Sequence, residues 1–124
     1  MKPIPRISEA EWEVMEVLWK DSPQIAAEVH ARLKDRSQWK SNTVRTLIAR
    51  LVQKGILRHE ADGNRYLYSP AVTREQCVET VGQSFLDKVF GGAVEPLLLH
   101  FASRARLTRQ EADQLRQILE RKDT

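Results

Sequence analysis

The sequence is poor in the features that mark secreted and membrane proteins. Its 124 residues include a single cysteine, Cys77, which cannot form an internal disulfide and therefore fits a reducing compartment. No apolar run approaches the ~18 residues that a membrane span requires, and the first residues lack the apolar core of a signal peptide. The sequence therefore predicts a cytoplasmic protein that does not insert into a membrane.

The arrangements of side chains that catalysis requires are missing as well. There is no glycine-rich phosphate loop, and no serine, cysteine or acid is paired by its spacing with a histidine. His30, His59 and His100 do not have the spacing of metal ligands. We therefore expect no enzyme activity, no metal site and no cofactor.

The residues that are present have the composition of a globular protein, with 41% hydrophobic and 30% charged side chains. The net charge is only +3, but it is unevenly distributed: residues 34–58 carry seven Lys and Arg against the single acid Asp35, a net charge of +6. A solvated helix face is one interpretation of such a run. The lack of glutamates four residues from the basic ones favours a polyanionic partner instead.

Most of this charge falls on a predicted helix that begins with Ser41 as its cap and stops at Gly55. At ~100° per residue, its apolar side chains fall on one face, namely Val44, Leu47, Ile48 and Leu51. The other face has hydroxyl, amide and guanidinium groups without a carboxylate, on Asn42, Thr43, Arg45, Thr46, Arg50 and Gln53. Such a face is suited to a polyanion with readable edges.

Two helices are predicted before the basic helix. The first begins with a capping box of Ser8 and Glu11. The second is expected to begin at Ser22-Pro23, with serine as the cap and proline as the first helical residue, and to end near Arg36. Three short helices of which the third is basic predict a helix-turn-helix unit.

A β-hairpin is predicted directly after the basic helix. Residues 57–61 and 65–69 alternate in the manner of strands, and Asp62-Gly63-Asn64 between them is a strong turn signal. A hairpin in this position is a wing. Arg65 at its tip is placed to contact a phosphate or a minor groove, although an arginine at a turn is also an ordinary solubilising residue. Residues 1–70 are thus predicted to be a winged helix-turn-helix domain.

Residues 71–124 are predicted to form three more helices. Thr73 with Gln76 and Thr108 with Glu111 are capping boxes, and Gly91-Gly92 ends the first of the three. About fifty residues cannot bury this many apolar side chains alone, so we expect the unit to pair with a second copy. The predicted fold is mostly α with a small β-hairpin, a winged helix-turn-helix domain followed by a three-helix dimerisation domain.

Nearly the whole chain resembles the penicillinase and methicillin-resistance repressor family. The residues that match include Ala10-Glu11-Trp12-Glu13-Val14-Met15, Thr43-Val44, Thr46-Leu47, Arg50-Leu51, Lys54-Gly55, Ser84-Phe85-Leu86 and Gly91-Gly92. The resemblance implies a homodimer that represses transcription at a palindromic operator. By position, it implies that Thr43 and Thr46 face base edges and that Arg50 contacts the DNA backbone.

The resemblance also implies a mode of regulation. In inducible family members, a membrane-bound antibiotic sensor triggers cleavage of the dimerisation domain, commonly between an asparagine and a phenylalanine, and the pair here is His100-Phe101. The implied partners are operator DNA, a second copy and a membrane-bound sensor protease pathway, and the implied target is a β-lactam-resistance gene. Lys40 and Asn42 depart from the usual serine and lysine of the family, so we expect the operator preference to differ in detail.

The predicted DNA-binding residues are Lys40, Ser41, Asn42, Thr43, Arg45, Thr46, Arg50 and Arg65. The threonines supply hydroxyls and methyls for base edges, Asn42 pairs with adenine, and the basic side chains neutralise phosphates. The alternative is a winged-helix module that docks an acidic protein. Such a module would bind a palindrome no better than a random duplex.

Overall fold

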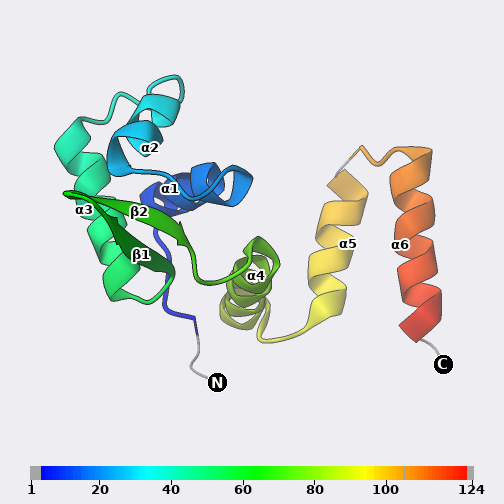
Figure 1. The fold of residues 1–124 in the computed structure, drawn as a ribbon. Helices are drawn as coiled ribbons and strands as arrows, with labels where there is room; N and C mark the ends of the chain where they lie inside the picture. The colour runs from blue at the N-terminus through cyan, green and yellow to red at the C-terminus, as the bar shows by residue number, and fades with distance from the viewer. Residues whose placement is uncertain (1–3, 105, 123–124) are drawn as a thin grey trace. The chain divides into compact units, whose positions relative to one another are not determined.

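The computed structural model describes residues 4–104 and 106–122, which form three helices and a hairpin followed by three helices (Figure 1). The elements are α1 (Glu9–Lys20), α2 (Ala26–Leu33), α3 (Ser41–Gln53), β1 (Leu57–Asp62), β2 (Arg65–Pro70), α4 (Arg74–Phe90), α5 (Val94–Arg104) and α6 (Arg109–Lys122). This order confirms the predicted fold class. Among the described residues, no helix is long and apolar enough to cross a membrane.

The first three helices and the hairpin share one hydrophobic core. Its buried side chains are Val14, Met15, Val17 and Leu18 of α1, Val29 and Leu33 of α2, Val44, Leu47, Ile48 and Leu51 of α3, and Ile56 and Leu57 before and in β1. All four apolar residues that helical periodicity assigned to the inner face of α3 are therefore buried. Each buried side chain of this size stabilises the fold by about 1.5–3 kcal/mol, and together they fix which face of α3 points outward.

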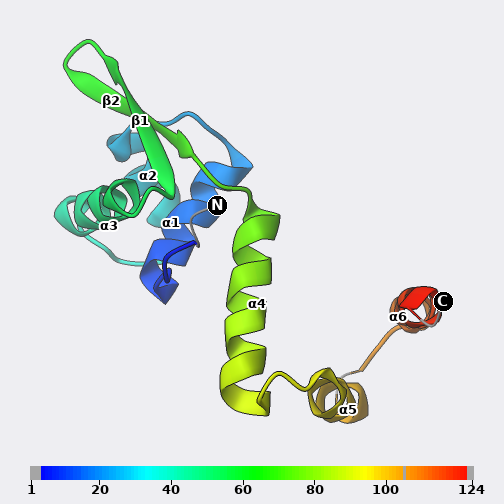
Figure 2. The same ribbon diagram turned by 90° about the horizontal axis from the view of Figure 1, so that it is seen from below.

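The hairpin extends beyond the three helices as a wing (Figure 2). Its strands are antiparallel, with Leu57 opposite Pro70 and Asp62 opposite Arg65. The turn between them contains Gly63 at φ +67°, a left-handed conformation that glycine adopts readily. The predicted hairpin is confirmed.

Two predicted helix starts are wrong. Helix α2 begins at Ala26 rather than at Pro23, because Gln24 exchanges two backbone hydrogen bonds with Tyr68 of the wing, at 3.0 and 2.8 Å. Residue 24 is thereby held extended and cannot join the helix. In α3, Ser41 is the first helical residue and Lys40 is the cap, without a side-chain hydrogen bond.

The chain divides into two compact units, Met1–Val81 and Gly82–Thr124, with the division inside α4. The predicted capping boxes are present in both: the Thr73 hydroxyl accepts from the amide of Gln76 at 3.1 Å, and the Thr108 hydroxyl accepts from that of Glu111 at 3.1 Å. Helix α4 ends at Gly91 and Gly92, with φ of +61° and +86°. A boundary between functional domains at residues 70/71 remains a prediction.

Candidate nucleic-acid interface

Helix α3 presents a continuous polar face to solvent. Because its apolar residues are buried in the core, Asn42, Thr43, Arg45, Thr46 and Arg50 are all exposed on the opposite side. Lys40 and Ser41 are exposed at its start. The helix contains no Asp or Glu, so nothing on this face repels phosphate.

The Thr46 side chain is oriented by its own helix. Its hydroxyl donates a hydrogen bond to the backbone carbonyl of Asn42 at 2.9 Å. The hydroxyl proton is thus used within the helix, while the oxygen lone pairs and the methyl group remain available. Thr46 can therefore accept a hydrogen bond from a base amino group or contact a thymine methyl.

Arg65 lies at the tip of the wing, where it is paired with Asp62. Its Nη2 atom is 3.2 Å from the Asp62 carboxylate, and the two side chains are 58% and 50% exposed. Exposed ion pairs of this kind contribute only about 0–1 kcal/mol. A phosphate can therefore replace the Asp62 carboxylate at little cost.

Lys54, the last basic residue of the helical stretch, does not face solvent freely. Its Nζ atom is 2.7 and 2.9 Å from the two carboxylate oxygens of Glu11, and it also donates to the carbonyl of Arg6 at 2.8 Å. Glu11 is only 2% exposed. The charge of +6 counted from the sequence therefore overstates what residues 34–58 offer to DNA.

The Glu11 carboxylate joins the first turn of α1 to the end of α3. It also accepts from the backbone amide of Ser8 at 2.8 Å, which completes the predicted capping box. Burial alone would raise the pKa of Glu11, but the hydrogen bonds from Lys54 and Ser8 outweigh it, so the pKa lies below its usual value. Glu11 is therefore a charged, buried anchor for the helix that carries the polar face.

The connection into α3 is held by a second side-chain contact. The Nε2 atom of His30 lies 2.9 Å from the carbonyl oxygen of Trp39. Trp39 itself is half-buried and packs against the core. The start of α3 is thus positioned by α2, as its end is positioned by α1.

The second unit contains the pair His100-Phe101 in α5. Phe101 is 53% exposed and its ring meets the His100 ring edge to face, with centroids 5.1 Å apart. The bond between them lies inside a helix, so a protease would have to unwind α5 locally before cutting.

Cys77 in α4 is fully buried, and this burial raises the pKa of its thiol. It is therefore a packed side chain.

Sequence comparisons match this chain to penicillinase and methicillin-resistance repressors. The sequence model of the penicillinase repressor family matches residues 7–121. The penicillinase repressor of Bacillus licheniformis is 38% identical over 120 residues, which are 97% of this chain and 94% of that protein. The methicillin resistance regulatory protein MecI of Staphylococcus aureus strain N315 is 32% identical over 116 residues, 94% of each chain.

Two solved structures match 61% of this chain. The DNA binding domain of the repressor BlaI is 41% identical, with a TM-score of 0.55, over 61% of this chain and 93% of that domain. Monomeric Bacillus licheniformis BlaI in complex with the blaP half-operator is 41% identical, with a TM-score of 0.53 and the same coverage. This chain belongs to the penicillinase repressor family, which is a family of transcriptional repressors and not of enzymes.

Proposed function

We propose that this protein represses transcription as a homodimer bound to a palindromic operator. The observation that carries the proposal is the exposed face of α3, on which hydroxyl, amide and guanidinium groups gather without a carboxylate. The solved structure of a relative in complex with a half-operator supports DNA binding by this face. DNA is the partner that this face fits, and the cytoplasm is where the protein would meet it.

Each side chain of the face has a role in this proposal. Helix α3 enters the major groove, where Thr43 and Thr46 contact base edges and Asn42 pairs with adenine. Lys40 at the cap of α3, Ser41, Arg45 and Arg50 on α3, and Arg65 on the wing bind phosphates and set the position of the helix.

The exposed apolar side chains of α4 to α6 support dimerisation by residues 71–124. None of the described residues of α5 is buried. The exposed residues of α4 to α6 include Val78, Val81, Phe85, Val89, Val94, Leu98, Leu99, Phe101, Leu115 and Ile118. A second copy would cover this surface and place two α3 helices about one turn of DNA apart, ~34 Å, or a multiple of it.

The relatives named for penicillinase and methicillin resistance suggest the regulated gene. We propose that the protein controls a β-lactam-resistance gene and that a membrane-bound sensor protease pathway inactivates it by cleavage at His100-Phe101. The exposure of Phe101 on a helix with no buried residue among those described supports this position for the cut.

Selection from a pool of random duplexes tests the proposal without knowledge of the operator. The wild-type protein is expected to enrich sequences with two inverted half-sites whose centres lie one helical turn or a multiple apart. The control is an Arg45→Glu/Arg50→Glu variant, which should enrich nothing. A wild-type protein that enriches no symmetric sequence would favour the protein-docking module instead.

A further inference from the structure

We infer that Glu16, Trp19 and Arg74 form a tether that fixes the start of α4 against α1 and so determines which half-site spacing the dimer accepts. The inference rests on the proposed function, because spacing matters only to a dimer on a palindrome. It concerns contacts that lie wholly within the first compact unit, Met1–Val81.

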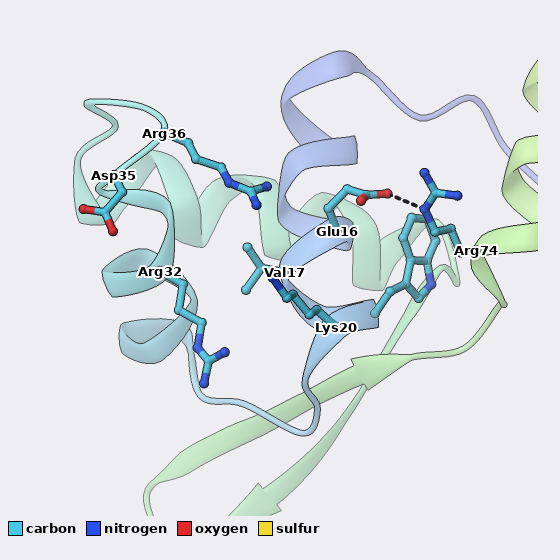
Figure 3. A pocket seen from close by; sticks show the side chains of 8 residues that line it. Glu16, Val17, Lys20, Arg32, Asp35, Arg36 and Arg74 are labelled. Carbon is cyan, nitrogen blue, oxygen red and sulfur yellow. Dashed lines mark hydrogen bonds and ion pairs between the residues drawn. The ribbon is translucent and has the colours of Figure 1, made fainter. Parts of the chain in front are cut away.

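The tether consists of two contacts across more than fifty residues of sequence. The Arg74 guanidinium donates from Nε to the Glu16 carboxylate at 2.7 Å (Figure 3). The Trp19 indole donates from Nε1 to the backbone carbonyl of Val72 at 3.0 Å. Glu16 and Trp19 are one turn apart on α1. Their two contacts therefore hold Arg74 and Val72, which are close together in the segment that leads into α4.

The segment before α4 has little freedom of its own. Only residues 71–73 separate β2 from α4. The amide of Ala71 donates to the carbonyl of Ile56 at 2.8 Å, and Val72 packs against the core. The Trp19 ring is in turn held edge to face by Trp12, with centroids 5.3 Å apart. These contacts hold residues 71–73 in place, so the segment is not expected to act as a flexible linker.

The start of α4 matters because the helix continues from the first unit into the second. A helix transmits the direction of its first turn, whereas a flexible connection would let each DNA-binding unit search many orientations. If the tether holds the start of α4, it is expected to restrict the separation of the two α3 helices in a dimer. Glu16, Trp19 and Arg74 are positioning residues, since they touch no part of the proposed DNA-binding face.

We expect that these contacts can be removed without loss of the fold. Glu16 and Arg74 are 32% and 52% exposed, and Trp19 is half-buried. An exposed ion pair and one hydrogen bond each contribute modestly to stability. The Trp19→Phe change keeps an aromatic ring beside Trp12 and removes the N–H donor.

The experiment compares the wild type with the Trp19→Phe/Arg74→Gln variant in full-length form. Affinities are measured for the selected palindrome, for versions whose half-site spacing is changed by two or five base pairs, and for a duplex with a single half-site. We expect the single half-site to be bound within about twofold of wild type. The preference of the variant for the native spacing over the altered spacings should fall at least about tenfold.

A charge-exchanged variant, Glu16→Arg/Arg74→Glu, should keep the spacing preference because it restores the ion pair. The control Glu13→Gln, on the same helix as Glu16, should leave the spacing preference unchanged. Two outcomes would overturn the inference: an unaltered spacing preference in the double variant, or equal losses on the single half-site and the palindrome. A wild-type protein without any spacing preference would overturn the proposed dimer on a palindrome first, and the inference with it.

Discussion

The basic side chains of residues 34–58 have two different uses. Arg45 and Arg50 lie exposed on α3, whereas the half-buried Lys54 is bound by the buried Glu11 carboxylate. Helical periodicity predicts the exposed face because the spacing of apolar residues decides it locally. It cannot predict that Lys54 has a partner 43 residues earlier, because only the packing of α1 against α3 brings the two together.

Replacement of Glu11 by Gln should lower the free energy of unfolding by about 2 kcal/mol, because it leaves the Lys54 ammonium without its buried counter-charge. The matched control is Glu13→Gln on the same helix, which should shift stability by at most ~0.5 kcal/mol. Urea unfolding at pH 7, followed by circular dichroism, measures both. Equal stability of the two variants would contradict the anchoring role.

The same pair predicts a pH dependence. The pKa of Glu11 is lower in the folded protein than its usual value of 4.5, so its contribution is present in full above pH 4.5 and is lost as the pH falls through the folded pKa. Wild-type stability should therefore drop more steeply than that of Glu11→Gln when the pH is lowered below 4.5. If the free energies of unfolding of the two proteins fell in parallel as the pH is lowered, the result would contradict this contribution of Glu11.

Arg50 should contribute a phosphate contact in each subunit. Its replacement by alanine is expected to reduce the slope of log affinity against log salt by ~0.9 per contact, and so by about two for a dimer. Lys88→Ala, an exposed cation on α4, is the control and should leave the slope unchanged. An unchanged slope in the Arg50 variant would remove this residue from the interface.

At the scale of elements, local signals predict helix ends well where no distant strand competes. The capping boxes at Ser8, Thr73 and Thr108 are all present, since each depends on residues three positions apart. The start of α2 could not be predicted in this way. Ser22-Pro23 has the residues of a helix start, but the backbone of Gln24 is paired with Tyr68 in the wing.

The end of α3 gives a prediction at this scale. Gly55 has φ +78°, and a Cβ atom added to it would meet no atom within 4 Å, so Gly55→Ala should cost about 1 kcal/mol from backbone strain alone. Gly82 lies inside α4 in equally open space without a positive φ, and Gly82→Ala should stabilise by about 0.5–1 kcal/mol. Thermal unfolding should shift in opposite directions for the two variants. Shifts in the same direction would contradict this interpretation.

At the scale of the whole molecule, the second unit leaves much of its apolar surface exposed. Phe85 on α4 is 45% exposed and Leu99 on α5 is 61% exposed, so other parts of the chain do not cover these side chains. The sequence predicts this excess of apolar surface from the length of the segment. It cannot predict which side chains meet across a dimer, because that depends on the second copy.

Sedimentation equilibrium tests the proposed dimer. Wild-type protein is expected to be dimeric at micromolar concentration, and Phe85→Asp/Leu99→Asp should be monomeric because it places charges on the apolar surface. Tyr66→Asp is a matched control, since Tyr66 is 50% exposed on the wing and should not affect association. A monomeric wild type would contradict the assignment of residues 71–124.

The central claim is that the exposed face of α3 recognises operator sequence. It is tested most directly by the ratio of affinities for the selected palindrome and a scrambled duplex, measured at one salt concentration for the wild type and for Thr43→Ala/Thr46→Ala. Loss of base contacts worth ~1–3 kcal/mol each should lower this ratio by about tenfold or more, while binding to the scrambled duplex stays the same. An unchanged ratio, or equal losses on both duplexes, would contradict the claim.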